Sequence, residues 1–404
     1  MNAFVSAQPI FDERLNVHAY DLEFRGGAWA FFSEAFEAAS ASEEPVDVCD
    51  VVDFDGISGH TKSHVLFPRN LLARHLPVLF PVEMLIVGLS ADEAHGRELL
   101  AVCRELKEFG YELALDDFSL RHMDSPFLEI ASIARVDTAA IGEEEQRRIC
   151  EGLSRRGIHA LAKNVAAAKA LDQAREFGYT YCQGDFFRRP VRRTGNRIPP
   201  EQTRHMQLLS QVNKPELPYG ELEGLIKQDV SMTYKLLRFI NSAWYGLKQS
   251  VDSIRHALVL LGPAEVRLWA TMLMLRDIGK EKPDELFRRS LIRAKMAERM
   301  APLIGLKAKS PQLFLVGTFS LADALTDMPM ANMLKSLPLN DDIKQALLGA
   351  TSKFGQVCKA VASYETGEWG PFSSAAEALG LDEKAMPALF RTAREWADEA
   401  MDVL

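Results

Sequence analysis

Residues 65–182 alternate short apolar runs with amphipathic segments, and this pattern constrains the fold more than any other feature of the chain. Repeated strand and helix units predict a mainly parallel sheet, and their number favours a closed barrel over an open sheet. Gly110, Gly157 and Gly178 each stand before a predicted strand, where a left-handed helix C-cap is needed. The predicted strands are residues 17–24, 84–89, 113–115, 133–136, 158–161 and 179–182, and the intervening helices are residues 92–109, 126–131, 143–156 and 165–177.

The second half of the chain shows helical periodicity, with proline or glycine repeatedly at the joints. Between the halves, residues 188–202 carry three prolines and five arginines, which is typical of a linker. We therefore predict an α/β plus all-α protein of two domains. The predicted boundaries are a barrel at residues 1–192, a linker at residues 193–207 and a helical bundle at residues 208–404.

Composition narrows the class of partner and the cellular compartment. The net charge of −9 opposes binding to nucleic acids and anionic membranes, because phosphate surfaces attract an excess of Lys and Arg. No apolar stretch approaches the roughly 18 residues of a membrane span, and the N-terminus is unlike a signal peptide. The five cysteines never form a CxxC pair, which is typical of reduced thiols. We expect a cytoplasmic protein.

Two adjacent carboxylates, Asp116 and Asp117, follow the apolar run at residues 113–115. Ligands and metals in α/β folds are held at the carboxyl ends of parallel strands, so this pair is a candidate catalytic centre. The structural alternative is that the two aspartates cap the following helix or form ion pairs with Arg135 or Lys163. We favour the structural alternative.

Five motifs in the first half occur in a characteristic order. They are Gln8-Pro9-Ile10, AYDLEFR at residues 19–25, LALDDFS at residues 113–119, ARVD at residues 134–137 and YCQGDFFRRP at residues 181–190. As an ordered set they resemble an EAL-type cyclic-di-GMP phosphodiesterase domain. That resemblance implies a modified TIM (β/α) barrel in which two divalent metals activate water against a phosphodiester.

Transferred onto this sequence, the metal ligands of the resemblance are incomplete. The signature glutamate falls on Asp21, the expected asparagine on or near Leu66, and the lysine beside the metals on Arg135. Residues 84–90 contain no carboxylate where an acid is expected, and two further glutamates fall on Lys163 and Ala166. Mg²⁺ requires six well-placed oxygen ligands. We therefore predict no metal, no cofactor and no enzymatic activity, with vestigial catalytic residues Asp21, Asp116, Asp117 and Asp137.

An alternative keeps the barrel as a nucleotide-binding domain. Arg25 matches the family arginine that contacts the guanine nucleotide, and Gln183 is also retained. Lys163 could supply a positive charge beside a phosphate in place of a metal. These three residues are the candidate ligand-binding set, with cyclic di-GMP as the ligand that the resemblance implies.

The second half resembles an HDOD domain, an HD-like helical bundle. The resemblance is carried by residues 235–262, 313–330 and 362–369. The His-Asp doublet of an HD metal centre would fall on Ser320 and Leu321, so no metal centre is expected there. Trp244 and Tyr245 pack in the core or form an aromatic surface for a protein partner.

From these observations we predict a catalytically inactive protein-interaction platform in bacterial cyclic-di-GMP signalling. Its unidentified protein partners would bind the HDOD domain, and the barrel would provide a homodimer contact. The first alternative is a cyclic-di-GMP sensor without turnover. The second is an active metal-dependent phosphodiesterase that uses Asp21, Asp116, Asp117 and Asp137.

Overall fold

The computed structural model describes residues 4–33, 54–190, 209–214, 218–227, 230–241 and 251–404. The chain divides into two compact units. The first comprises Met1–Phe187 together with Tyr364–Trp369, and the second comprises Arg188–Ser363 and Gly370–Leu404. The predicted linker at residues 193–207 lies outside the described residues, so the predicted domain boundaries stay a prediction.

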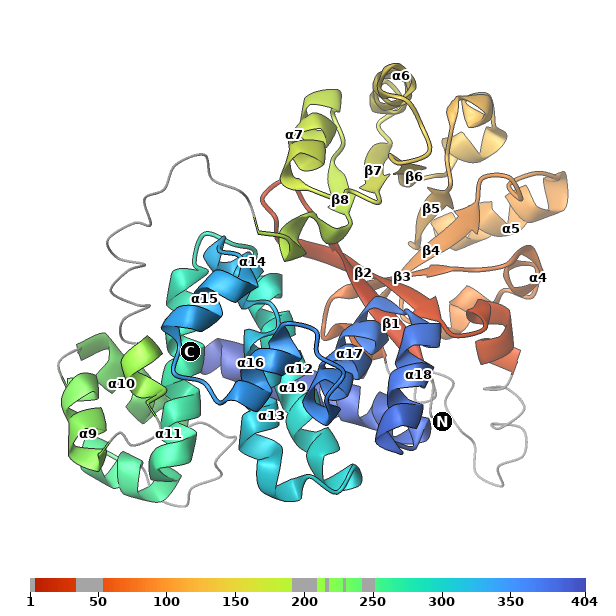
Figure 1. Cartoon of the computed structure of the whole chain (residues 1–404). Coiled ribbons are helices and arrows are strands. Elements are labelled where there is room, and N and C mark those ends of the chain that lie inside the picture. Colours follow the sequence, from red (N-terminus) through yellow and green to blue (C-terminus); the bar gives the residue numbers. More distant parts are fainter. Residues whose placement is uncertain (1–3, 34–53, 191–208, 215–217, 228–229, 242–250) are drawn as a thin grey trace. The chain divides into compact units, whose positions relative to one another are not determined.

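The first unit is a closed barrel of eight strands in sequential order (Figure 1). Strand β1 is antiparallel to both of its neighbours, β2 and β8, and all other neighbouring pairs are parallel. The prediction of an α/β barrel is therefore confirmed. The strands are β1 (Val5–Phe11), β2 (Val17–Phe24), β3 (Lys62–Leu66), β4 (Leu85–Ser90), β5 (Glu112–Asp116), β6 (Ile133–Asp137), β7 (His159–Lys163) and β8 (Tyr181–Gln183).

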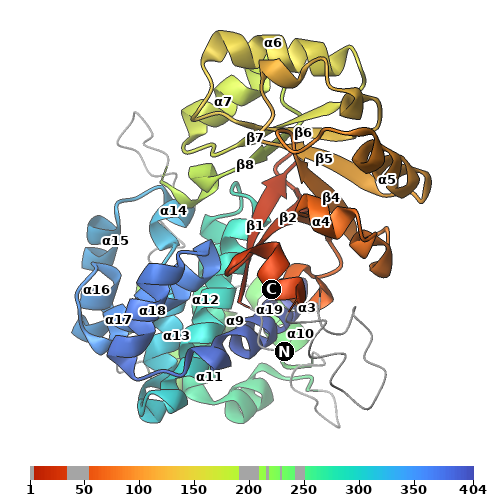
Figure 2. The ribbon, with the colours of Figure 1, turned by 90° about the vertical axis from the view of Figure 1, so that its right-hand side faces the viewer.

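Helices cover the outside of the barrel between consecutive strands (Figure 2). Two predictions of helix bounds need correction: the segment at residues 92–109 becomes helical only at Arg97, and residues 126–131 form a single 3₁₀ turn. Gly178 takes the predicted left-handed C-cap conformation, with φ of 92°. The α-helices are α3 (Phe54–Ser58), α4 (Arg69–Leu72), α5 (Arg97–Glu108), α6 (Glu143–Ser154) and α7 (Ala168–Phe177), and the 3₁₀ turns are η1 (Leu76–Leu79), η2 (Leu120–His122), η3 (Pro126–Glu129) and η4 (Asp185–Arg188).

The interior of the barrel is built in layers, because every second residue of a strand faces inward. One layer is an apolar cluster of fully buried residues, formed by Ile10, Ala19, Ile86, Ala114, Ile133 and Leu161. Two residues further toward the carboxyl ends of the parallel strands, the same faces carry polar side chains. This polar layer contains Asp21, His64, Asp116, Arg135 and Gln183.

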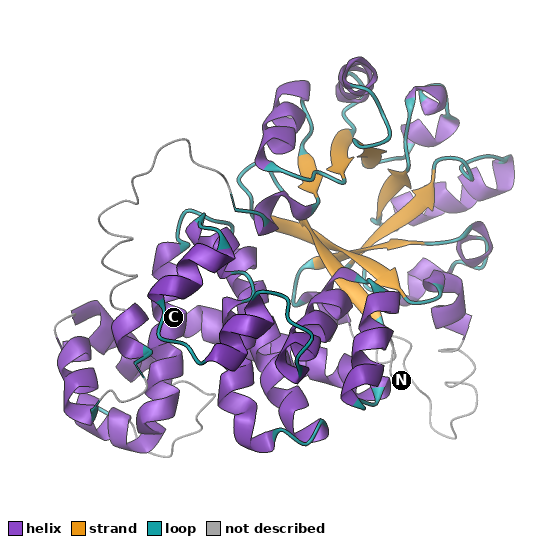
Figure 3. Ribbon diagram, in the orientation of Figure 1, coloured by secondary structure: helices purple, strands orange, loops and turns teal. Residues whose placement is uncertain are grey.

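The described residues of the second unit form helices and contain no strand (Figure 3). The predicted helical bundle is therefore confirmed, although the helix at residues 330–336 was not predicted. The α-helices are α9 (Tyr219–Lys227), α10 (Val230–Ile240), α11 (Ile254–Ile278), α12 (Asp284–Leu303), α13 (Ser310–Phe319), α14 (Ala322–Thr326), α15 (Met330–Ser336), α16 (Asp341–Leu347), α17 (Lys353–Thr366), α18 (Trp369–Leu379) and α19 (Met386–Val403), and the 3₁₀ turns are η6 (Lys307–Lys309) and η7 (Glu383–Ala385).

Helix α11 is two helices joined at Gly262, whose φ of 75° is not helical. The kink separates Ile254–Gly262 from Ala264–Ile278 by 112°. In the described part of the chain, no single helix has the length and apolarity to cross a membrane, and this bent pair meets the criteria only when both helices are counted together.

Candidate functional site

Arg135 of β6 lies at the centre of the polar layer and joins three strands. Its Nη1 donates to Oδ2 of Asp116 at 2.8 Å, and its Nη2 forms a short ion pair with Oδ2 of Asp21. The same Nη2 donates to Oε1 of Gln183 at 2.8 Å. Gln183 in turn donates from Nε2 to Oδ2 of Asp21 at 2.8 Å. One guanidinium thus connects both carboxylates and the amide of the layer.

His64 of β3 connects the two carboxylates a second time. Its Nδ1 lies 2.7 Å from Oδ1 of Asp21, and its Nε2 lies 3.3 Å from Oδ1 of Asp116. Nη1 of Arg135 lies 2.7 Å from Nδ1 and 3.0 Å from Nε2 of the same ring. The imidazole therefore bridges the carboxylate oxygens opposite those that Arg135 binds.

The sequence analysis missed His64, because it aligned the expected ligand of this strand with Leu66. Leu66 is 40% exposed, whereas His64 is buried at 1%. No local sequence signal identifies it, because KSHVL does not alternate between polar and apolar residues, and the pairing of Asp21 with His64 is seen only in the β2–β3 register of the structure. Gly88 on β4 makes room for the ring, since a Cβ there would lie 2.4 Å from Nε2 of His64.

Burial and neighbouring charges shift the pKa values of the two carboxylates and the imidazole in this cluster. Burial raises the pKa of Asp21, but Arg135 and His64 lower this pKa by more than burial raises it. The pKa of Asp21 therefore lies well below its usual range. The pKa of Asp116 is lowered by the same balance. Burial and Arg135 lower the pKa of His64, yet Asp116 and Asp21 outweigh them and raise it. Two carboxylates therefore face a buried guanidinium and an imidazole ring whose pKa they raise.

The rim above this cluster carries a separate ion pair. Nζ of Lys163, at the carboxyl end of β7, lies 3.1 Å from Oδ1 of Asp117. Their side chains are 22% and 60% exposed. Asp137 ends β6 and accepts a hydrogen bond from the backbone N–H of Ala139 at 2.9 Å. The rim thus presents two carboxylates and one ammonium group to solvent.

Arg25 follows β2 at its carboxyl end and lies over the ring of Phe4, 5.0 Å from the centroid. Such a cation–π contact helps to hold the guanidinium in place. The candidate residues therefore separate into two groups. Asp21, Asp116 and Gln183 meet in the polar layer, whereas the remaining ones, Arg25, Asp117, Asp137 and Lys163, lie at the carboxyl ends of the strands.

The ion pairs that we expected for the adjacent aspartates are present. Asp116 pairs with Arg135 at 2.8 Å, and Asp117 pairs with Lys163 at 3.1 Å. The neighbouring aspartates separate because Asp117 has φ of 55°, which turns its side chain out of the polar layer. The two residues therefore occupy different chemical environments.

Two divalent metals, which the EAL resemblance implies, do not fit this set of side chains. Asp21 and Asp116 already direct their oxygens at Arg135 and His64, and a divalent cation needs several carboxylate or carbonyl oxygens to itself. Over the described ranges, no group of three or more His, Cys, Asp or Glu is arranged to hold a metal ion.

In the helical unit, Ser320 is one of the two positions on which the His-Asp doublet of an HD metal centre would fall. Nη1 of the buried Arg293 donates to its Oγ at 3.3 Å, and Oγ donates to the carbonyl of Gly317 at 2.7 Å. This polar contact contains no imidazole. The predicted interaction residues Trp244 and Tyr245 lie outside the described residues.

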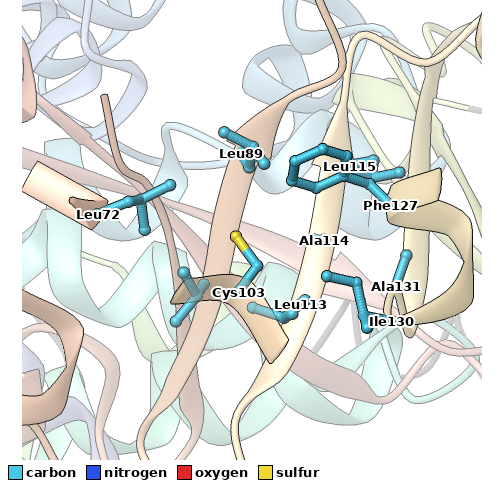
Figure 4. A pocket seen from close by; sticks show the side chains of 10 residues that line it. Leu72, Leu89, Cys103, Leu113, Ala114, Leu115, Phe127, Ile130 and Ala131 are labelled. Carbon is cyan, nitrogen blue, oxygen red and sulfur yellow. The ribbon is translucent and has the colours of Figure 1, made fainter. Parts of the chain in front are cut away.

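An apolar cavity lies between the sheet and helix α5 (Figure 4). Leu89, Leu115 and Phe127 line one part of it, and Cys103 points into it from α5. Its walls are almost entirely hydrocarbon, so it offers no polar group that could orient a ligand. We interpret it as a packing defect of the barrel exterior.

Comparison with known proteins defines the class. The HDOD domain model matches residues 198–338. The cyclic di-GMP phosphodiesterase CdgJ of Vibrio cholerae is 31% identical over 98% of this chain and 92% of its own length. YuxH of Bacillus subtilis is 30% identical over the whole of both chains. The EAL domain of FimX from Pseudomonas aeruginosa, solved with c-di-GMP, is 20% identical, with a TM-score of 0.35 over 46% of this chain and 89% of that one.

A barrel followed by an HDOD domain is the architecture of the two-domain EAL–HDOD proteins. The chain belongs to this family, of which CdgJ is a nearly full-length relative. The family membership predicted from the ordered motifs is confirmed.

The relationship to CdgJ overturns one prediction. We expected the chain not to be an enzyme, because both domains lack metal ligands of their relatives. That prediction is wrong, since a relative that matches 98% of the chain is named a cyclic di-GMP phosphodiesterase. The prediction was based only on the metal ligands known from the EAL family. The absence of those ligands does not exclude catalysis by other polar side chains.

Proposed function

We propose that this protein acts in cyclic-di-GMP signalling and that its barrel recognises the phosphodiester of cyclic di-GMP at the carboxyl ends of the strands. Nearly full-length similarity to CdgJ, a cyclic di-GMP phosphodiesterase by name, supports the proposal. The same name makes hydrolysis of cyclic di-GMP the activity to assay in this chain. Barrels of this kind bind their ligands at the carboxyl ends of the strands, where the rim residues lie.

The observation that carries the proposal is the exposed pair of Lys163 and Asp117 above the polar layer. Because an exposed ion pair contributes little stability, Lys163 can exchange the carboxylate for a phosphate oxygen at small cost. Arg25, held over Phe4, supplies a second cation at the carboxyl end of β2. Gln183 is bonded to Arg135 and Asp21, so it positions the polar layer below the ligand.

Calorimetric titration with cyclic di-GMP, combined with chromatography of the reaction products, tests the proposal. We expect wild-type protein to bind, and Lys163→Ala and Arg25→Ala each to bind roughly tenfold or more weakly. Lys107→Ala is the matched control, because Lys107 contacts Ser132 before β6, at the other end of the barrel. Absence of both binding and hydrolysis in the wild type, or wild-type affinity in Lys163→Ala, would contradict the proposal.

We also propose that the helical unit contacts a protein partner and that the barrel forms the homodimer contact. Exposed apolar side chains on α10 and α11 support the first part: Tyr234 is 65% exposed, Val259 68% and Leu260 50%. Substituting Val259→Asp and Leu260→Asp should abolish association with that partner and leave binding of cyclic di-GMP unchanged. Light scattering of the full chain measures the homodimer, and a monomeric mass would refute it.

A further inference from the structure

Every carboxylate oxygen of Asp21 and Asp116 lies within 3.3 Å of a nitrogen of Arg135 or His64. Oδ2 of each aspartate binds the Arg135 guanidinium. Oδ1 of each aspartate faces a different nitrogen of the His64 ring, at 2.7 Å and 3.3 Å. Oδ1 of Asp116 forms no hydrogen bond with the described residues, and the His64 ring lies beside it.

Burial separates this cluster from ordinary surface ion pairs. The side chains of His64, Asp116 and Arg135 are 1%, 2% and 2% exposed. A cation that entered would have to displace the buried Arg135 guanidinium and leave it without its partners, which is strongly unfavourable in a protein interior. Adding a divalent cation to the intact cluster would place like charges within a few ångströms.

The neighbouring strands are shaped to hold this arrangement. Gly88 leaves the space that the His64 ring occupies, and any Cβ there would lie 2.4 Å from Nε2 and 2.8 Å from Cε1. Gln183 fixes the other side, since it accepts from Arg135, donates to Asp21 and donates to Gln8 at 3.2 Å. Packing against Gly88 on one side and the hydrogen bonds of Gln183 on the other therefore fix the positions of the side chains in the cluster.

We propose that the Arg135 guanidinium takes the place of divalent metal ions at Asp21 and Asp116, with the His64 ring packed against the opposite carboxylate oxygens, so that this position is closed to Mg²⁺ and Mn²⁺. The positive charge in the polar layer then comes from the Arg135 guanidinium and does not depend on a bound metal ion. Arg135 acts here as a positioning residue, because it holds both carboxylates and the Gln183 amide in one plane of contacts. The inference does not require cyclic di-GMP to be the ligand.

Mn²⁺ binding to the full chain, followed by electron paramagnetic resonance of the free ion, is the primary test. We expect the wild type to show no saturable binding up to roughly 1 mM Mn²⁺. Asp117→Asn is measured in parallel, because any weak binding by the exposed rim carboxylates would fall in that variant. Saturable micromolar binding that Asp117→Asn leaves intact would overturn the proposal, and this arm requires no change to the buried cluster.

Removing the internal cation provides the converse test. Arg135→Ala frees oxygens of both carboxylates, so we expect Mn²⁺ to bind this variant at least tenfold more tightly than the wild type and to raise its melting temperature. His64→Gln, which retains Arg135, should gain less affinity. Equal Mn²⁺ affinity in Arg135→Ala and wild type would overturn the proposal, and if that variant does not fold, the wild-type titration still decides. Loss of cyclic di-GMP binding would instead bear on the proposed function alone.

Discussion

Arg135 and Asp116 form an ion pair of 2.8 Å in which each side chain is 2% exposed. Asp116 ends β5 and Arg135 lies within the neighbouring strand β6, so the sheet itself brings them together. A buried ion pair adds little net stability compared with apolar groups, but removing one partner leaves an unpaired buried charge. The polar layer therefore depends on Arg135 more than on any exposed cation of the barrel.

Arg135→Met should destabilise the barrel strongly, because it leaves the carboxylates of Asp21 and Asp116 without their buried guanidinium. We expect a loss of about 3–5 kcal/mol in the free energy of unfolding, measured by urea denaturation. Lys163→Met is the matched control: its pair with Asp117 is exposed, so the loss should stay below about 1 kcal/mol. Similar losses in both variants would show that the buried cluster does not stabilise the fold.

His64 makes the stability of the barrel dependent on pH. The raised pKa of His64 means that the folded state holds its proton more tightly than the unfolded state, whose value is near 6.5. Its contribution is therefore fully present below pH 6.5 and is lost as the pH rises through the higher folded pKa. The lowered pKa values of Asp21 and Asp116 act in the opposite direction and remove stability as the pH falls below 3.8.

The measurement is the urea midpoint of wild type and His64→Gln from about pH 6 to about pH 9. Wild type should lose stability across this range, and His64→Gln should start lower and depend less on pH. His159→Gln serves as the control, because His159 is exposed at the start of β7. If the urea midpoint of His64→Gln changed with pH as steeply as that of the wild type, the pH dependence would come from another group.

The sequence predicts some contacts of this site but not others. The predicted contacts depend on residues near strand ends, and the missed contact depends on how two strands pair. The pairs of Asp116 with Arg135 and of Asp117 with Lys163 follow from acids and bases near the carboxyl ends of the predicted strands, on β5 and β6 in the first pair and on β5 and β7 in the second. His64 meets Asp21 through the β2–β3 register, which no local pattern encodes.

Strand β1 was also missed, for a different reason. It contains Pro9, which reads as a turn residue in the sequence. In the structure, Pro9 pairs with Tyr20 in an antiparallel ladder that closes the barrel between β2 and β8. Closure depends on pairing between strands far apart in the sequence, so local propensity does not predict it.

Cysteine reactivity should report the opening of the barrel. Burial raises the pKa of Cys103 to about 11, of Cys150 to about 12 and of Cys182 to about 11. Because the thiolate is the reactive form, these cysteines should resist iodoacetamide at about pH 8 in the native protein and react on unfolding. Mass spectrometry of peptides after alkylation assigns each site. Rapid native-state labelling of Cys150 would contradict its placement on the buried face of α6.

Gly88→Ala should destabilise the barrel, because the new Cβ would lie 2.4 Å from Nε2 of His64 and 3.0 Å from the carbonyl oxygen of Val65. Overpacking of this kind costs about 1–3 kcal/mol. Gly142→Ala is the control, since its φ is −68° and no atom lies within 4 Å of the added Cβ.

A double-mutant cycle separates the steric effect at Gly88 from its other consequences. In a His64→Ala background the ring is absent, so Gly88→Ala should cost at least about 1 kcal/mol less than in the wild type. The remaining cost then reports the backbone contact with Val65. Equal costs in both backgrounds would show that Gly88 does not make room for the imidazole, and the bridge between Asp21 and Asp116 would need no small residue on β4.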